Sequence, residues 1–193
     1  MRPRTARRLA TAAVLAATLP GAASCAVGPE RATPVGVVAA ASPTAGSASP
    51  AAPVVPARAP ETLSFSAKTL DGTAFSAAAL AGRPVVLWFW APWCATCASQ
   101  AWTVAEIAPK YRDTVPIVGV AGLGERKAMK EFVTEFDLAG TPQLDDRSGT
   151  LWRRFEVVEQ STFVIVDRDG RVVHQGFLDG ESLTRQVDAL ARG

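Results

Sequence analysis

The chain has 193 residues, a formal net charge of +2, three cysteines and one histidine. Its positive charge lies in the first 60 residues, because from Glu61 onward there are 14 basic and 17 acidic residues, a net charge of −3. The 133 residues of that second part are enough for one hydrophobic core. Their charge excludes the basic surface that nucleic-acid binding requires. We therefore expect one globular domain over residues 61–193 and no nucleic-acid partner.

Residues 1–25 have the order of an export signal. Four arginines lie among the first eight residues, an apolar run follows over residues 9–19, and small residues continue to Cys25. This order of basic, apolar and small residues is typical of a secretory signal peptide. The apolar run has 11 residues, whereas a membrane-spanning helix needs about 20. The sequence thus predicts an extracytoplasmic protein.

Cys25 follows Ala22-Ala23-Ser24, a pattern that resembles a bacterial lipobox except that Ala22 stands where leucine is usual. Under this interpretation the chain is cleaved before Cys25, and a lipid attached there anchors the protein to the cell membrane. The alternative is ordinary cleavage nearby, which gives a secreted protein. We favour lipidation, because an unpaired exposed thiol would invite mispairing.

Residues 26–60 consist mostly of Ala, Pro, Val, Ser and Gly, and contain half of the chain's 14 prolines. Such a segment buries too little apolar surface to offset the entropy lost on ordering. We predict a disordered, semi-rigid tether that holds the following domain away from a membrane.

Residues 61–193 are predicted to alternate between strands and helices. Residues 85–90 are apolar throughout, which is typical of a strand buried on both faces. In chain order the pattern predicts an edge strand at 63–65, a turn at 71–72, a short helix at 77–80, buried strands at 85–90 and 115–120 with a helix at 94–112 between them, helices at 125–138 and 150–155, a hairpin of strands 162–166 and 171–177, and a final helix at 181–191. This order indicates an α/β fold, a mixed sheet with helices on both faces.

Two cysteines, Cys94 and Cys97, follow the buried strand. Residues three apart share a face of a helix, so two thiols at this spacing can close into a small disulfide ring. If the helix begins at Cys94, its sulfur lies at unpaired N–H groups and at the positive end of the helix dipole, which favours the nucleophilic thiolate. The spacing predicts a redox dithiol in which Cys94 is exposed and attacks, and Cys97 resolves.

A structural zinc site is the alternative explanation of this spacing. Such a site needs four ligands. The only other cysteine is Cys25, which lies in the predicted leader, and the only histidine is His174. One chain cannot complete the site, and we predict neither a metal nor another cofactor.

Three further residues of interest precede the first cysteine in the sequence, Trp90, Pro92 and Trp93. The two tryptophans could form an apolar shoulder for a substrate peptide and shield Cys97. Alternatively, Trp90 belongs to the core and only Trp93 is exposed. The other tryptophans, Trp88, Trp102 and Trp152, are expected to have packing roles.

The order of elements, with a CxxC between the first central strand and its helix, resembles the thioredoxin fold over nearly all of residues 61–193. Four segments are similar to the TlpA/ResA/DsbE-type branch of this fold, and most of all to the mycobacterial secreted DsbE and DsbF proteins: residues 65–72, 87–94, 119–122 and 163–170. The resemblance implies thiol–disulfide exchange outside the cytoplasm. For the most similar proteins it implies oxidation of secreted proteins.

One departure from this family concerns the loop that faces the CxxC. The family usually carries a cis-proline there, but an ungapped alignment places Gln160 and Ser161 in this loop, with Ser161 in place of the proline. A cis bond costs about 2.5–4 kcal/mol before a residue other than proline. We therefore expect Ser161 to be trans and the loop to be rearranged. The chain does contain a Thr-Pro pair like the one usual in this loop, at Thr141-Pro142, but it lies one secondary-structure element earlier in the sequence. We therefore interpret Pro142 as a strand-entry proline.

The other departures concern acids and the residues between the cysteines. Trp88 stands where thioredoxins have a buried Asp, and Gln100 stands where the branch often has a Glu, so neither can accept the proton of the resolving thiol. The dipeptide Ala95-Thr96 lacks the proline common there and adds no positive charge, although Thr96 could offer a hydroxyl to a thiolate.

Three functions fit these observations. The first is an extracytoplasmic thiol–disulfide oxidoreductase that oxidises thiols of secreted or envelope proteins and exchanges electrons with a membrane redox partner; an oxidising compartment favours it. The second is a reductant that uses the same residues, for example in cytochrome c maturation. The third is a tethered binding module with a weakened redox site, which the loss of the proline and of both acids leaves open.

Overall fold

The computed structural model describes residues 59–193. The predicted leader, Cys25 and the predicted tether up to residue 58 lie outside the described residues. In chain order the elements are η1 (Glu61–Leu63), β1 (Ser66–Lys68), β2 (Ala74–Ser76), η2 (Ala77–Leu80), β3 (Val85–Trp90), α1 (Ala95–Tyr111), β4 (Ile117–Ala121), α2 (Arg126–Glu135), η3 (Leu138–Gly140), β5 (Gln143–Asp145), α3 (Thr150–Arg154), β6 (Thr162–Val166), β7 (Val172–Phe177) and α4 (Gly180–Arg192), where η denotes a 3-10 helix.

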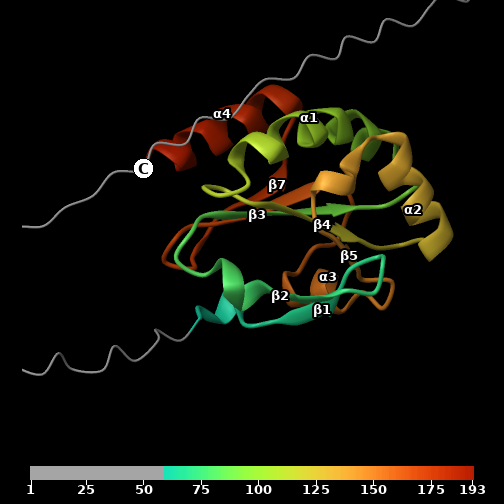
Figure 1. Cartoon of the computed structure of the whole chain (residues 1–193), viewed down its shortest axis with the longest axis horizontal. Coiled ribbons are helices and arrows are strands. Elements are labelled where there is room, and N and C mark those ends of the chain that lie inside the picture. The colour runs from blue at the N-terminus through green and yellow to red at the C-terminus, as the bar shows by residue number, and fades with distance from the viewer. Residues whose placement is uncertain (1–58) are drawn as a thin grey trace, which may run out of the picture. The chain divides into compact units, whose positions relative to one another are not determined.

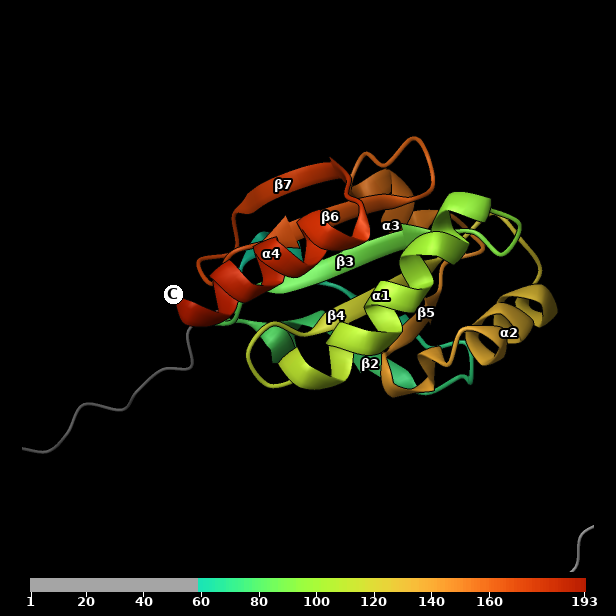
Figure 2. The same cartoon turned by 90° about the horizontal axis from the view of Figure 1, so that it is seen from above.

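A five-stranded sheet in the order β5-β4-β3-β6-β7 forms the centre of the molecule. Strands β3, β4 and β5 are parallel, while β6 and β7 run antiparallel to their neighbours. Helices α1, α2 and α4 cover one face, and α3 with the β1–β2 hairpin covers the other (Figure 1). Seen from above, α1 lies between α4 and α2 (Figure 2). The predicted mixed sheet with helices on both faces is confirmed.

Strand β3 divides the core into two layers. All six of its residues are buried, and successive side chains point to opposite faces of the sheet. Trp88 and Trp90 therefore pack under α1 and α2, whereas Leu87 and Phe89 pack against α3. The continuous apolar run of β3 reflects this burial on both faces.

Several predicted elements differ from the observed ones in detail. Leu63 lies in η1 rather than in a strand, because its N–H bonds to the Pro60 carbonyl at 2.9 Å and the first strand begins only at Ser66. The helix predicted to end at residue 138 stops at Glu135, and Asp137 takes a left-handed conformation before η3. The short strand β5 was not predicted, although Pro142 does precede it as a strand-entry proline.

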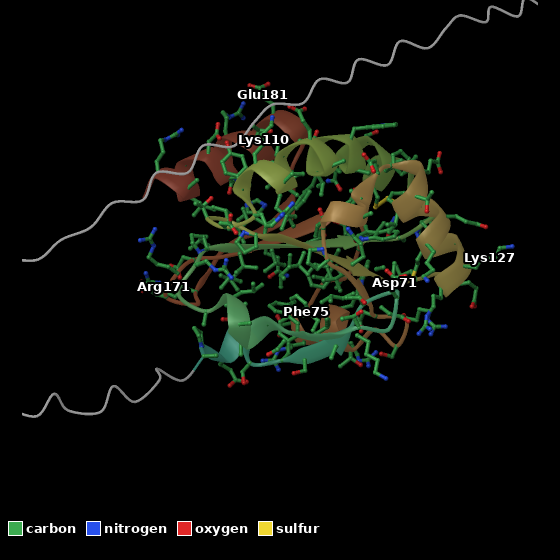
Figure 3. All side chains as sticks on the ribbon, in the orientation of Figure 1. Asp71, Phe75, Lys110, Lys127, Arg171 and Glu181 are labelled. Carbon is green, nitrogen blue, oxygen red and sulfur yellow. A yellow bond between two sulfur atoms is a disulfide. The ribbon has the colours of Figure 1, made fainter. Side chains whose placement is uncertain are left out.

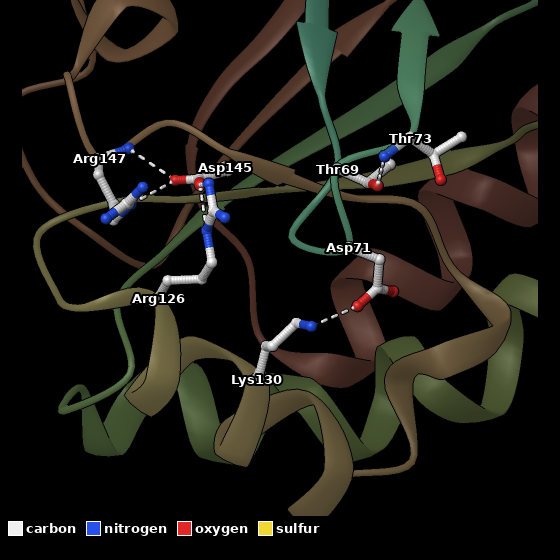
Figure 4. Close-up of polar contacts among 7 residues, drawn as sticks. All are labelled: Thr69, Asp71, Thr73, Arg126, Lys130, Asp145 and Arg147. Carbon is white, nitrogen blue, oxygen red and sulfur yellow. Dashed lines mark hydrogen bonds and ion pairs between the residues drawn. The ribbon is translucent and has the colours of Figure 1, made fainter.

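Charged side chains attach the β1–β2 hairpin and β5 to α2. Lys130 pairs with Asp71 at 2.7 Å, and Arg126 pairs with Asp145 at 2.6 Å (Figure 4). Asp145 also binds Arg147 at 2.8 Å. Burial opposes ionisation of Asp145, but the hydrogen bonds from Arg147 and Arg126 outweigh it and lower the pKa of the carboxyl. By contrast, Lys127 points away from the molecule into solvent (Figure 3).

No helix among residues 59–193 combines the length and the apolar character that a membrane span requires.

Candidate active site

Cys94 and Cys97 lie at the point where β3 passes into α1. The strand ends at Trp90, a turn follows, and Cys94 is the N-cap residue of α1. The two cysteines form a disulfide, with their Cα atoms 5.2 Å apart. The predicted spacing on one helical turn therefore brings the two sulfurs together.

The backbone of α1 supplies a hydrogen-bond donor to the first cysteine. The Cys97 N–H donates to Cys94 Sγ at 3.0 Å, in the way that a side-chain oxygen caps a helix. The positive end of the helix dipole lies at the same place. Both interactions are stronger when Cys94 Sγ carries negative charge, so this position stabilises a thiolate.

Cys94 is less exposed than the sequence predicts. Only 6% of the residue is accessible, so the prediction of an exposed Cys94 is wrong. Cys94 is still the more accessible of the two cysteines, as expected, because Cys97 is fully buried. The reason is the N-cap geometry, which turns Sγ back over the helix end and towards the loop at Ser161. Ala95 and Thr96, between the cysteines, are exposed.

Of the two flanking tryptophans, only Trp93 can contact a substrate. Trp90 is fully buried, stacks on Phe132 and donates to Gln143 Oε1 at 2.9 Å. It therefore belongs to the core, and the two-tryptophan shoulder is wrong. Trp93 is 62% exposed. Trp102 is equally exposed, and its indole makes a T-shaped contact with Phe136, the C-cap residue of α2.

Trp93 is held in place by a loop that the sequence did not identify. Its Nε1 donates to the Leu123 carbonyl at 2.7 Å, and Leu123 is itself 52% exposed. The half-buried Pro92 ring packs on Gly124, where a Cβ would approach it to 2.5 Å. Trp93, on the turn before Cys94, and Leu123, in the loop after β4, thus present adjoining apolar surface.

The loop before β6 reaches the disulfide through Ser161. This residue is buried, and its Oγ lies 4.0 Å from Cys94 Sγ, while Gln160 before it is half-buried. Ser161 has φ +71° and its N–H bonds to the Phe89 carbonyl at 2.9 Å. A proline has φ near −65° and no N–H, so it cannot follow this backbone path.

Gln100 and Trp88, at the two positions without the usual acids, form a hydrogen-bonded pair. Trp88 Nε1 donates to Gln100 Oε1 at 2.8 Å, and Ser161 Oγ donates to the same oxygen at 3.1 Å. Gln100 Nε2 donates to the carbonyls of Ser161 and Leu178, at 3.2 and 3.0 Å. The buried amide is therefore fully satisfied and connects α1 to the loops that enter and leave the β6–β7 hairpin. Sequence reasoning noted both departures but not that they pair.

Carboxylates elsewhere on α1 do not reach the sulfurs. Glu106 is exposed and pairs with Lys110 at 2.9 Å. Within residues 59–193 no group of three or more His, Cys, Asp or Glu side chains is arranged to hold a metal ion.

The sequence and the fold are similar to those of known proteins. A sequence model of the AhpC/TSA family matches residues 56–175. The chain is 40% identical over 112 residues to the soluble secreted antigen MPT53 of Mycobacterium tuberculosis H37Rv, an alignment that covers 58% of this chain and 64% of the antigen. It is 28% identical over 129 residues to the thiol-disulfide oxidoreductase ResA of Bacillus cereus ATCC 10987, covering 66% and 73% of the two chains.

Solved structures show the same arrangement of elements. MTB DsbF superposes with a TM-score of 0.64 at 44% identity, covering 68% of this chain and 98% of DsbF. A secreted Mycobacterium tuberculosis disulfide oxidoreductase homologous to E. coli DsbE gives a TM-score of 0.62 at 35% identity, covering 67% and 98%. The exposed lipoprotein thioredoxin Etrx1 of Streptococcus pneumoniae gives 0.57 at 26% identity, covering 65% and 98%. The thioredoxin-like fold is thereby confirmed, and the chain belongs to the AhpC/TSA family of thioredoxin-fold proteins.

Proposed function

We propose that this protein is an extracytoplasmic thiol–disulfide oxidoreductase whose redox centre is the Cys94–Cys97 pair. The observation that carries the proposal is the hydrogen bond from the Cys97 N–H to Cys94 Sγ, at the N-terminus of α1 and within the turn that the Cys94–Cys97 disulfide closes. Similarity to DsbF and to ResA-type oxidoreductases supports it.

The reaction proceeds by two exchanges in which electrons balance. A client thiolate attacks Cys94 Sγ, the more accessible sulfur, and Cys97 leaves as a thiolate that takes a proton from water. A second client thiolate then attacks the client sulfur of the mixed disulfide. Cys94 leaves as a thiolate, and the client disulfide is complete. The protein has gained the two electrons that the client lost.

The client is proposed to be a secreted or envelope polypeptide. Trp93, on the turn before the attacked Cys94, and Leu123, in the loop that holds Trp93, offer exposed apolar surface. An extended segment with apolar side chains near its cysteine would bury that surface and align its thiolate with Cys94.

The cellular setting follows from the predicted leader and tether. Export, lipid attachment at Cys25 and a tether over residues 26–60 would place the domain at the outer side of the cell membrane, within reach of a membrane redox partner that reoxidises it. Similarity to a soluble secreted antigen and to an exposed lipoprotein thioredoxin supports an extracytoplasmic site. In such a compartment the direction we propose is oxidation of client thiols.

Trapping of the mixed disulfide tests this function. Cys97→Ser leaves Cys94 as a lone thiol that can attack a client disulfide, which is the reverse of the second exchange, and no Cys97 thiolate remains to release the client. Adducts with envelope proteins should therefore accumulate on non-reducing gels and disappear when Cys94 is also changed to serine. Absence of such adducts would contradict the proposal.

Two exposed tryptophans provide a matched test of the client surface. Trp93→Ala should slow exchange with a cysteine-containing apolar peptide severalfold and leave exchange with a small disulfide unchanged. Trp102→Ala removes an equally exposed indole from a site outside this turn and should alter neither rate. Equal effects of the two substitutions would argue against the proposed surface.

A further inference from the structure

The Ser161 hydroxyl lies between two acceptors. Its Oγ is 3.1 Å from Gln100 Oε1 and 4.0 Å from Cys94 Sγ. In the disulfide state Cys94 Sγ carries no charge, and Gln100 is the better acceptor. When Cys94 becomes a thiolate, Sγ becomes an anionic acceptor, and hydrogen bonds to ionised groups are about twice as strong as neutral ones.

The hydroxyl can turn from one acceptor to the other without leaving a buried group unpaired. Gln100 Oε1 keeps its hydrogen bond from Trp88 Nε1 at 2.8 Å when the Ser161 hydrogen points elsewhere. Gln100 Nε2 keeps both of its carbonyl partners. The penalty that normally accompanies loss of a buried hydrogen bond is therefore small.

The backbone holds this hydroxyl in place against its own preference. Ser161 has φ +71°, a conformation that residues other than glycine seldom adopt. Its N–H bonds to the Phe89 carbonyl, and its carbonyl accepts from Gln100 Nε2. A strained backbone conformation persists where several surrounding contacts together hold the residue in it, and such residues cluster at functional sites.

We propose that the Ser161 hydroxyl stabilises the Cys94 thiolate by donating a hydrogen bond to its sulfur, and that Gln100 is the positioning residue that holds Ser161 there. The proposal rests on the proposed function and identifies a further catalytic residue within it. When Cys94 leaves the mixed disulfide with the electron pair of the S–S bond, the Ser161 O–H turns from Gln100 Oε1 to Cys94 Sγ. No proton is transferred, and the hydroxyl remains neutral throughout.

Removal of the hydroxyl tests this in the full chain. Ser161→Ala should raise the pKa of the Cys94 thiol by about one unit, because a hydrogen bond to a charged group is lost. The pKa is read from the pH dependence of the alkylation rate at Cys94, localised by fragment-ion mass spectrometry. The glutathione equilibrium should shift up to about tenfold towards the disulfide, which corresponds to about 30 mV.

Two further variants separate the hydroxyl from the backbone. Ser161→Gly also lacks the hydroxyl but adopts φ +71° without strain. It should therefore reproduce the Ser161→Ala shifts and remain measurable if Ser161→Ala folds poorly. Thr162→Val removes the neighbouring hydroxyl, which donates to the Glu159 carbonyl at 3.0 Å, and should leave the pKa of Cys94 unchanged.

The outcomes distinguish this inference from the function on which it rests. A wild-type chain without reversible dithiol exchange would contradict the proposed function. A wild-type chain that exchanges, while the Ser161→Ala and Ser161→Gly variants keep its Cys94 pKa, would contradict the role of Ser161 alone. An equal shift in Thr162→Val would also overturn it, because the effect would then not belong to the hydroxyl that faces the sulfur.

Discussion

Trp88 donates a 2.8 Å hydrogen bond to Gln100 between β3 and α1, so two neutral side chains pair at the two positions where the family resemblance implies acids. The pair lies in the core, with Trp88 fully buried and Gln100 only 3% exposed. It leaves the resolving cysteine without a side-chain proton acceptor on α1. In the proposed reaction the proton of Cys97 is therefore exchanged with water rather than with a side chain of α1.

Gln100→Glu restores a carboxyl group at this position and should make stability depend on pH. An ionised carboxylate would face the Ser161 and Leu178 carbonyls, to which Gln100 now donates. The folded-state pKa of the new group is then raised above its ordinary value of about 4.3, because burial and these oxygens disfavour its charge. Near pH 4 the variant should be about 1 kcal/mol less stable than wild type, because a protonated carboxyl has one O–H and cannot donate to both carbonyls. It should lose about 2 kcal/mol more as pH rises from the unfolded-state value through the raised folded-state pKa.

Denaturant unfolding of both proteins across this pH range measures the difference. A stability difference that stays constant with pH would show that the carbonyls do not oppose the charge. A difference in unfolding free energy that shrinks as pH rises would show that the surroundings of residue 100 stabilise the ionised carboxylate.

Ser161→Pro should destabilise the protein by about 2–3 kcal/mol and should not accelerate exchange. Proline cannot adopt φ +71° and would remove the N–H that bonds to the Phe89 carbonyl. Ser161→Gly should instead stabilise the fold by up to about 1 kcal/mol, because it relieves the strain. Thermal unfolding compares the variants, and an unchanged melting temperature together with faster exchange in Ser161→Pro would mean that the loop follows the path usual in the family.

Asp145→Asn should remove part of the acid sensitivity of the domain. The pKa of Asp145 is lowered because the hydrogen bonds from Arg147 and Arg126 outweigh the opposing effect of burial. Its contribution to stability is therefore present above the unfolded-state pKa of 3.8 and is lost as pH falls through the lower folded-state value. The substitution should cost about 1 kcal/mol at pH 7, and the cost should diminish as pH falls below 3.8, as followed by unfolding in urea. A cost that does not change with pH would show that the loss comes from altered packing or hydrogen bonding and not from loss of the charge.

Cys25→Ala should abolish membrane attachment. If Cys25 carries lipid, the wild-type protein sediments with membranes, and the variant is released or remains unprocessed. Fractionation with N-terminal sequencing checks this. Wild-type protein found only in the culture supernatant, with an N-terminus beyond residue 25, would show that the lipobox interpretation is wrong.

Local patterns were sufficient to predict the central strands and the start of α1. The apolar run of β3 and the cysteine spacing after it define the strand and the helix end without reference to distant residues. Features that depend on distant contacts were missed. The three-residue β5 is too short to show a period, and the burial of Cys94 depends on a loop 67 residues away.

The positions of other site residues follow from the tertiary fold. Trp90 and Trp93 lie in one short segment with the same residue type, yet one is fully buried and the other is 62% exposed. Only the stacking of Trp90 on Phe132 and the bond from Trp93 to the Leu123 carbonyl separate them. The left-handed conformation of Ser161 likewise arises from its bonds to Phe89 and Gln100 rather than from its own preference.

The reduction potential of the Cys94–Cys97 couple tests the central claim most directly. Equilibration of the full chain with glutathione buffers, followed by quantification of the Cys94–Cys97 disulfide, gives the value. An oxidant whose Cys94 thiolate is stabilised by the helix end should have a potential of about −200 mV or higher. A value near or below that of thioredoxin, about −270 mV, would contradict oxidation as the direction of the reaction, and the lack of a reversible couple would contradict the enzyme itself.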